Sequence, residues 1–196
     1  MLKILPVTLE GSYVRLEPLT HTHAVDLFEA AQSDEVWRYL PAPRPTRLEE
    51  INNLIESAFA LKVGGTQMPF AIIDRASNRA IGSTRYLDIQ PTNRNLEIGW
   101  TWLGRDYWRS PRNTECKYLL LQHAFETQQA IRVCLKTDKR NLISQAAIER
   151  IGGVKEGIMR NHMILHDGYI RDSVYYSILD SEWGAVKATL ETFLKR

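Results

Sequence analysis

Cysteine, charge of one sign and long apolar runs are all scarce in this sequence. The two cysteines, Cys116 and Cys134, are too isolated for a disulfide framework or a metal cluster, so we expect buried thiols in a reducing cytoplasm. The net charge of +2 does not predict nucleic-acid binding. No apolar run approaches the roughly 20 residues of a membrane span, and the N-terminus has no signal-peptide pattern. We therefore expect a cytoplasmic protein without membrane or nucleic-acid partners.

What is present is the composition of an ordinary globular chain. Of its 196 residues, 44% are hydrophobic and 24% are charged, which suits one domain over residues 1–196. Periodicity and turn residues predict strands at 13–18, 69–74, 80–90, 95–103, 132–137, 154–165 and 169–179, and helices at 24–31, 48–63, 114–128, 144–152 and 181–196. The expected caps are Thr20 or Thr22 for the first helix, Ser144 for the fourth and Ser181 for the last. This order predicts a mixed α/β fold, with a parallel strand pair across the helix at 114–128.

A basic loop connects the strand at 95–103 to the following helix. A helix N-terminus has unpaired backbone N–H groups and a partial positive charge, which makes it suited to anions. The loop adds cationic and polar side chains, namely Arg105, Arg109, Ser110, Arg112, Asn113 and Thr114. Such an arrangement suits a diphosphate or triphosphate ligand. Arginines on loops are more often simply solvated, so the loop alone leaves both interpretations open.

A second polar loop lies between the strand at 132–137 and its following helix. Asn141 can reach an amide group of a ligand, and Ala146 and Ala147 allow close approach to the helix. Asn and Ser are also common turn and cap residues, which is an ordinary structural explanation. If the two strands are parallel neighbours, both loops lie at one end of the sheet, where ligands bind in such sheets.

The order and spacing of four segments resemble the GCN5-related N-acetyltransferase (GNAT) superfamily, most closely its ribosomal-protein, RimJ/RimL-like branch. The segments are LEIGWTWL, NTECKYLLLQHAFE, TDKRNLISQAAIERIGGVKEG and RDSVYYSILDSEW, and the likeness runs from Val14 to Trp183. The resemblance implies a central, mostly antiparallel twisted sheet that is splayed at a parallel strand pair and flanked by helices. It also implies acetyl-CoA as the acetyl donor. The five histidines show no metal-ligand spacing, so we predict no metal.

The resemblance assigns the cofactor to the strand at 95–103 and to both loops. It implies that the backbone around Trp102 and Leu103 pairs with the pantetheine amides and that Asn141 hydrogen-bonds the same arm. The residues implied for the pyrophosphate are Arg109, Ser110, Arg112, Asn113 and Thr114. The small residues that the family usually has in this loop are replaced here by Pro111 and Asn113. Proline has no N–H to offer a phosphate, and compensation by Arg109, Arg112, Ser110 and Thr114 is a hypothesis, so the affinity for the cofactor stays open.

Acetyl transfer to an amine needs a base for the amine proton, polarisation of the thioester oxygen, and a proton or other stabilisation for the leaving thiolate. Glu97, two residues before Gly99 on the splayed strand, is the expected base, acting directly or through a water. Ser144 matches a serine proposed to protonate the thiolate in this branch, and backbone N–H near Trp102 would polarise the carbonyl. The structural alternatives are a strand glutamate in solvent or an ion pair, and a serine that only caps its helix.

Four further side chains are expected to line the acceptor groove or form its lid: Arg85, Tyr86, Trp37 and Tyr39. Large aromatic residues lie more often in the core, which is the alternative for the last three. The acceptor would be a primary amine, either a protein N-terminal amine or a small molecule. A homodimer through the last strands or the C-terminal helix is expected only by analogy.

Two interpretations of the function follow. The first is an N-acetyltransferase that transfers the acetyl group directly in a ternary complex, because neither cysteine is expected where the acetyl group would lie. The second is a catalytically silent module that binds CoA or a peptide, which the altered pyrophosphate loop motivates. Glu97 and Ser144 favour the enzyme, since a silent module needs neither.

Overall fold

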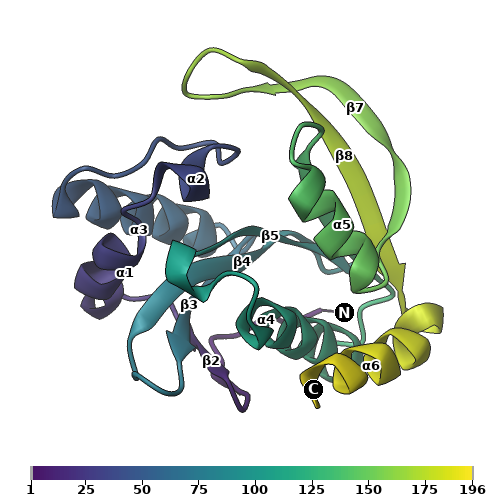
Figure 1. The fold of residues 1–196 in the computed structure, drawn as a ribbon. Coiled ribbons are helices and arrows are strands. Elements are labelled where there is room, and N and C mark those ends of the chain that lie inside the picture. Colours follow the sequence, from purple (N-terminus) through teal and green to yellow (C-terminus); the bar gives the residue numbers. More distant parts are fainter. Residues whose placement is uncertain (1, 196) are drawn as a thin grey trace.

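The computed structural model describes residues 2–195, and one mixed eight-stranded sheet runs through it (Figure 1). The strand order is β1-β2-β3-β4-β5-β6-β8-β7. Neighbouring strands are antiparallel except β5 and β6, which are parallel, as predicted. The strands are β1 (Leu9–Glu10), β2 (Val14–Pro18), β3 (Met68–Asp74), β4 (Ala80–Gln90), β5 (Asn95–Leu103), β6 (Arg132–Asp138), β7 (Val154–Ile164) and β8 (Ile170–Leu179).

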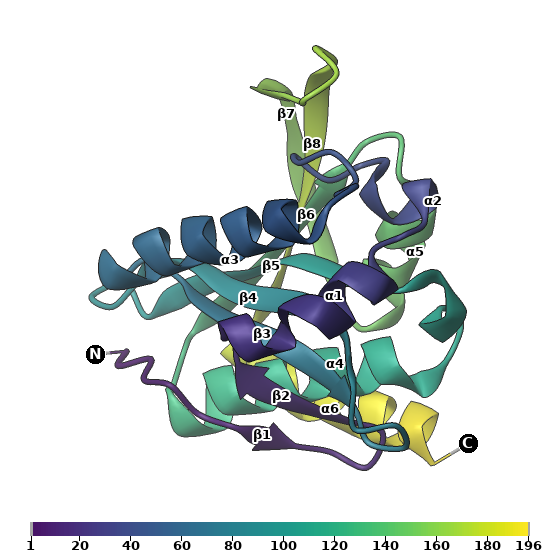
Figure 2. The same ribbon diagram turned by 90° about the vertical axis from the view of Figure 1, so that its left-hand side faces the viewer.

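Helices cover the two faces of this sheet (Figure 2). One side, called the α3 face here, carries α1 (Ala24–Ala30), α2 (Asp34–Trp37) and α3 (Leu48–Val63). The other side, called the α4 face, carries α4 (Pro111–Gln122), α5 (Leu142–Arg150) and α6 (Asp180–Leu194). Short turns complete the list: 3-10 turns η1 (His21–His23) and η2 (Arg105–Tyr107), and the π-helical turn η3 (His123–Thr127). None of the helices within residues 2–195 is long and apolar enough to cross a membrane.

Strand alternation on β5 separates core residues from site residues. Leu96 and Ile98 point into the larger hydrophobic cluster beneath α4 and α6. Because successive strand residues point to opposite faces, Glu97 and Gly99 lie on the α3 face. Burying the apolar side of β5 therefore fixes where its polar side points.

A bulge on β5 confirms the distortion that the family resemblance implied. The register with β4 shifts between the pairs Arg85–Gly99 and Ser83–Trp102, so β5 carries an extra residue there. Trp100 takes the left-handed backbone conformation, with φ 49°. A Cβ on Gly82 would lie 2.1 Å from the Trp102 carbonyl oxygen, so only glycine fits opposite the bulge.

The parallel ladder between β5 and β6 is short. It pairs residues 95–97 with residues 132–134, whereas β6 continues along β8 as far as Asp138. Beyond Glu97 the two parallel strands diverge. The strands therefore form a V, called the wedge here, that is closed where Glu97 pairs with Cys134 and opens toward the loops before α4 and α5.

A carboxylate from α4 anchors the first strands. Glu115 is 4% exposed, and its carboxylate accepts the backbone N–H groups of Ser12, Tyr13 and Val14 at 2.7, 2.6 and 2.7 Å. A Cβ on Gly11 would lie 2.5 Å from the same carboxylate. The turn between β1 and β2 is thus fitted around one buried anion.

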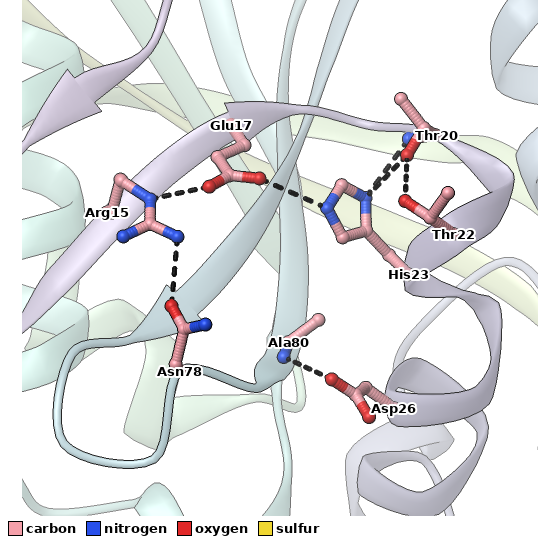
Figure 3. A network of polar contacts seen from close by, with 8 residues as sticks. All are labelled: Arg15, Glu17, Thr20, Thr22, His23, Asp26, Asn78 and Ala80. Atoms are coloured by element: carbon pink, nitrogen blue, oxygen red, sulfur yellow. Dashed lines mark hydrogen bonds and ion pairs between the residues drawn. The ribbon is translucent and has the colours of Figure 1, made fainter.

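A surface network positions α1 beside the sheet (Figure 3). Glu17 on β2 accepts hydrogen bonds from Arg15 at 2.5 Å and lies 3.3 Å from His23. Further along α1, Asp26 accepts the backbone N–H of Ala80 at 3.0 Å, and the pairing with Arg79 helps to hold the pKa of Asp26 below its usual range despite partial burial. These contacts tie α1 to β2 and to the start of β4.

Several predicted helix starts are wrong by a few residues. The helix predicted from 114 begins at Pro111, since proline fits the first helical position. The helix predicted from Ser144 begins at Leu142, because Asn141 is its N-cap. The last helix begins at Asp180, so Ser181 lies in its first turn, and its predicted end at 196 lies outside the described residues. Thr20 precedes η1 rather than α1.

The β7–β8 hairpin extends beyond the helical layers (Figures 1 and 2). β7 is the last strand of the sheet and most of its residues are exposed. The turn at the tip of the hairpin contains Gly168, which takes φ 82°. Four polar residues described below lie on this hairpin, namely His162, Arg171, Ser173 and Tyr175.

Candidate active site

Glu97 lies at the closed end of the wedge and is 4% exposed. Its Oε2 is 3.0 Å from Nζ of Lys136 on β6. Burial raises the pKa of Glu97, and the charge of Lys136 opposes that rise. A Cβ on Gly99 would lie 2.9 Å from Oε1 of Glu97, so the absence of a side chain there gives the carboxylate its place. A buried carboxylate beside one cation is a suitable proton acceptor.

A polar row continues from Lys136 across β8 to β7. The Lys136 ammonium lies 5.6 Å from the ring centre of Tyr175, whose hydroxyl is 3.3 Å from Nε2 of His162. The other ring nitrogen of His162 is 2.9 Å from the Ser173 hydroxyl. Burial and two nearby cations lower the pKa of His162, which favours the neutral ring. Lys136 and His162 could not be predicted from the sequence, because only the β6–β8 and β7–β8 pairings bring them to the site.

Cys134 lies closer to the site than expected. It is the ladder partner of Glu97 on β6 and is partly exposed. Burial raises the pKa of its thiol, and the neighbouring carboxylates add to this, although Arg132 opposes it. Cys116 lies in the core, where burial raises its pKa to about 11. Both side chains are free thiols, and neither environment favours a thiolate.

The loop before α4 keeps most of its anion-binding groups. Pro111 occupies the first helical position, which leaves the N–H groups of Ser110, Arg112 and Asn113 at the helix start. Arg109 is exposed and takes φ 54°, an uncommon backbone conformation for a residue other than glycine. The Ser110 hydroxyl donates to the Tyr107 carbonyl at 2.6 Å. The loop thus presents backbone donors and one exposed guanidinium.

Arg112, predicted to bind the pyrophosphate, is also paired within the fold. Its Nε donates to Oδ1 of Asp74 at 2.7 Å, and its guanidinium lies 5.3 Å from the Tyr107 ring centre. The pairing ties the loop to β3, and hydrogen bonds from Ser77 and Arg112 lower the pKa of Asp74 against the effect of its burial. This guanidinium is therefore engaged within the fold. Arg105 is similarly paired, with Glu35.

A different arginine reaches the first turn of α4. Nη2 of Arg150, at the end of α5, donates to Oγ1 of Thr114 at 2.8 Å. Thr114 is buried, so its hydroxyl links the two helices. Arg150 is exposed and brings a cation to the predicted phosphate site. No local signal could have found it, because it is 36 residues away from Thr114.

Asn141 and Ser144 lie together at the start of α5. Oδ1 of Asn141 accepts the backbone N–H of Ser144 at 3.0 Å. Asn141 is therefore the N-cap of α5, the role that was predicted for Ser144. Ser144 is half-buried in the first turn. Its hydroxyl has no hydrogen-bond partner among residues 2–195, so it remains available to a ligand.

Comparison with known proteins identifies the family to which this wedge belongs. The family described as acetyltransferase (GNAT) domain matches residues 14–154. The chain belongs to the GNAT acetyltransferase family. This confirms the family predicted from the sequence, and with it N-acetyltransferase activity. Acetyltransferases of this family use acetyl-CoA.

Three similar proteins place this GNAT enzyme among its relatives. A GCN5-related N-acetyltransferase from Brucella melitensis has a TM-score of 0.92 and 33% identity, covering 98% of this chain and 87% of that one. The ribosomal-protein-serine acetyltransferase of Escherichia coli (strain K12) is 23% identical over 172 residues, 86% of this chain and 94% of its own. Mycobacterium smegmatis RimJ in complex with CoA-disulfide shares the fold, with a TM-score of 0.83 and 18% identity, covering 96% and 95% of the two chains.

In this GNAT enzyme, two of the four predicted acceptor residues belong to the core. Tyr86 points to the α4 face, where its buried hydroxyl donates to the Leu120 carbonyl at 2.6 Å. That prediction was wrong because adjacent strand residues, here Arg85 and Tyr86, point to opposite faces. Trp37 is 2% exposed and packs in the hydrophobic cluster of the α3 face, with its ring 5.3 Å from that of Trp102, but it also lines a pocket together with Arg85.

Arg85 and Tyr39 do lie on the α3 face of the acetyltransferase. Arg85 is buried with its guanidinium 4.6 Å from the ring centre of Trp100 on the bulge. Tyr39 is half-buried in the loop between α2 and α3, and the centre of its ring lies 5.6 Å from the Arg140 guanidinium. Its carbonyl oxygen accepts a long 3.4 Å contact from Arg171 on β8. The loop of Tyr39 therefore borders the diverging strands.

Proposed function

We propose that this enzyme transfers the acetyl group of acetyl-CoA directly to a primary amine, with Glu97 as the base. The observation that carries the proposal is the buried Glu97 carboxylate at the point where β5 and β6 part. The similarity to a ribosomal-protein-serine acetyltransferase supports a protein N-terminal amine as the acceptor. The raised thiol pKa of Cys134 supports direct transfer over an acetylated enzyme.

The residues around the wedge fit the cofactor. On β5, the residues beyond Glu97, including Trp102 and Leu103, leave the ladder with β6, so their backbone can pair with the amides of a pantetheine arm. The helix start at Ser110, with Arg109 and Arg150 nearby, suits a pyrophosphate. When bound, acetyl-CoA supplies an activated acetyl thioester.

The chain's own groups then serve the proton movements. Glu97 accepts the proton from the amine nitrogen, directly or through a water, and Lys136 stabilises its ionised form. The backbone N–H near Trp102 polarises the carbonyl oxygen. As the carbon–nitrogen bond forms and the carbon–sulfur bond breaks, the hydroxyl of Ser144 gives the sulfur a proton and regains one from solvent. The half-buried position of that hydroxyl supports this role.

The decisive experiment compares calorimetric titrations with acetyl-CoA and with pantetheine, which lacks the pyrophosphate. We expect acetyl-CoA to bind with micromolar affinity and pantetheine to bind at least about tenfold more weakly, because charge-assisted contacts to phosphate are lost. The variant Arg109→Gln should reduce the difference in affinity between acetyl-CoA and pantetheine. The control variant Arg47→Gln, which changes an exposed arginine in the loop before α3, should leave that difference unchanged. Equal affinity for both ligands would contradict the proposal that the start of α4 binds the pyrophosphate.

A turnover assay separates the enzyme from a silent binding module. Thiol release from acetyl-CoA is followed with a pool of primary amines and amidated peptides that have free N-termini. We expect thiol release that depends on the amine and acetylated product by mass spectrometry. Tight cofactor binding without any product would favour the module, for which the engagement of Arg112 with Asp74 is the supporting observation.

A further inference from the structure

Two buried guanidinium groups on the α3 face have no acidic partner. Arg85 on β4 is 7% exposed and Arg171 on β8 is 5% exposed. Among the buried side-chain nitrogens and oxygens of residues 2–195, their two Nε atoms are those without a hydrogen-bond partner. An unsatisfied buried donor costs free energy, and more so when it carries charge. A folded chain that keeps two such groups in one region calls for a ligand that completes them.

Arg85 is held by neutral groups alone. Its Nη1 donates to Oε1 of Gln67 at 3.0 Å, and its guanidinium lies on the ring of Trp100. Burial without a carboxylate lowers its pKa to about 10, so it remains charged at neutral pH. Gln67 and Trp100 orient the guanidinium without neutralising it.

Arg171 is held still more weakly. Its Nη1 contacts the Tyr39 carbonyl at 3.4 Å, beyond the usual range of a good hydrogen bond. Asp138 on β6 is close enough to act on its charge, but the carboxylate of Asp138 is already bound by Arg140 at 2.8 and 3.1 Å. The guanidinium of Arg171 is oriented by a backbone carbonyl and lacks an anion of its own.

The two arginines lie on the same face of the sheet as Glu97, one on each side of it in the strand order. Arg85 is the ladder partner of Gly99, two residues along β5 on the same face. Arg171 approaches from β8, and its charge lowers the pKa of Glu97. Lys136 already neutralises the Glu97 carboxylate. The α3 face that carries the base therefore also carries two buried guanidiniums without an ion-pair partner among residues 2–195.

Resting on the acetyltransferase function proposed above, we propose that the acceptor is a primary amine that also carries a carboxylate, bound by these two guanidiniums. Guanidinium groups bind carboxylates through two parallel hydrogen bonds, which would satisfy the free Nε donors. A free amino acid and a peptide with an acidic residue after its N-terminus share this chemistry. Both are accommodated by the same arrangement of base and cations.

The test uses two matched pairs of acceptors that differ only in charge. The small pair is serine and serinamide, and the peptide pair is two amidated tetrapeptides that begin with serine-aspartate or serine-asparagine. We expect kcat/KM for the carboxylate member of at least one pair to be about 10- to 100-fold higher, as loss of a charged hydrogen bond implies. The responding pair distinguishes an amino acid from a peptide. Equal kcat/KM within both pairs overturns the proposal.

Variants assign the preference to the arginines. In the double variant Arg85→Gln and Arg171→Gln, the ratio of kcat/KM between the carboxylate acceptor and its uncharged partner should fall below about threefold. Each single variant shows how much its arginine contributes to that ratio. The ratio within one preparation does not depend on how much of it is folded. Arg160→Gln, on an exposed part of β7, should keep the preference. A preference that survives in the double variant places the carboxylate elsewhere and overturns the assignment.

Binding and stability measurements separate this proposal from the one on which it rests. If no acceptor is acetylated, calorimetry on the CoA-loaded protein still compares the members of each pair. Tighter binding of the carboxylate member then supports the anion site while counting against catalysis, and equal or absent binding of both overturns the site. Arg171→Met should leave Tm unchanged or raise it, because an unpaired buried charge is removed. A fall of several degrees would show a structural role and contradict the proposal.

Discussion

Two glutamates, Glu97 and Glu115, are equally buried at 4% exposure and are held in opposite ways. The Glu115 carboxylate accepts three backbone N–H groups from the β1–β2 turn, at distances of 2.6–2.7 Å. The Glu97 carboxylate has one cationic partner, Lys136, and faces the opening between two strands. Full satisfaction by backbone donors makes Glu115 a structural anchor. Incomplete satisfaction leaves Glu97 with a raised pKa and with oxygen lone pairs that an incoming donor can use.

The comparison extends to a glycine beside each carboxylate. A Cβ on Gly11 would lie 2.5 Å from the Glu115 carboxylate, and a Cβ on Gly99 would lie 2.9 Å from Oε1 of Glu97. Burial alone therefore does not tell a functional carboxylate from a structural one. What tells them apart is how many of the carboxylate's hydrogen bonds the fold itself supplies.

The largest expected effect is on turnover, in Glu97→Gln. The amide cannot accept the amine proton, so kcat should fall by about 10²- to 10⁴-fold. The free energy of unfolding should fall by about 1–2 kcal/mol, because the partly exposed Lys136 ammonium loses its partner. Steady-state kinetics and urea unfolding measure the two quantities, and calorimetry should show unchanged acetyl-CoA affinity. Unchanged kcat would remove Glu97 as the base.

The matched change at the other carboxylate, Glu115→Gln, should act on stability instead. An amide offers a weaker acceptor to three buried N–H groups, so we expect the free energy of unfolding to fall by about 2–4 kcal/mol. Turnover per folded molecule should stay within about twofold of wild type. Urea unfolding followed by active-site titration tests this. A large loss of kcat in fully folded protein would erase the distinction between the two glutamates.

The two neighbouring glycines offer a smaller version of the same contrast. Gly99→Ala should push the Glu97 carboxylate aside and lower kcat by about tenfold, since small misplacements of reacting groups are costly. Gly11→Ala should lower the free energy of unfolding by about 1–3 kcal/mol, as overpacking does, and leave kcat unchanged. Kinetics and unfolding curves of both variants are needed. The comparison fails if both variants lose the same property.

The smallest expected effect is a shift of a pH profile. Since Glu97 must be ionised to accept a proton, kcat/KM should fall as the pH drops through its raised pKa. In Lys136→Met the opposing charge is lost, so this acidic limb should move to higher pH by about one unit. The wild-type fold should also lose stability as the pH rises from 4.5 to the raised pKa, because the folded state binds the proton more tightly there. Glu97→Gln should abolish that slope.

Much of the fold could be predicted from the sequence because local patterns carry it. Alternation placed β5 at Asn95–Leu103, and the tight turn at Gly168 joined β7 to β8. The helix starts were less accurate, because caps depend on three-dimensional side-chain geometry. Asn141 rather than Ser144 caps α5, and Pro111 could be read equally as a loop residue or as a first helical residue.

The site was predictable where one strand carries it and unpredictable where strands meet. Glu97 follows from its position on β5, together with the family resemblance. Its partner Lys136 depends on the pairing of β5 with β6, and Arg150 reaches Thr114 from another helix. The pairing of Arg112 with Asp74 was equally hidden, because Asp74 lies 38 residues earlier. Long-range contacts of this kind leave no periodic signal in a sequence.

The short ladder between β5 and β6 also bears on the order in which the chain folds. The β7–β8 hairpin joins neighbouring segments, whereas the ladder brings residues 95–97 to residues 132–134 across the whole of α4. Contacts that close longer loops form more slowly. The reactive wedge would then close after the local hairpins β3–β4, β4–β5 and β7–β8, so a chain with only those hairpins formed would not yet hold the site. Pulsed hydrogen exchange would show this as late protection of residues 95–97.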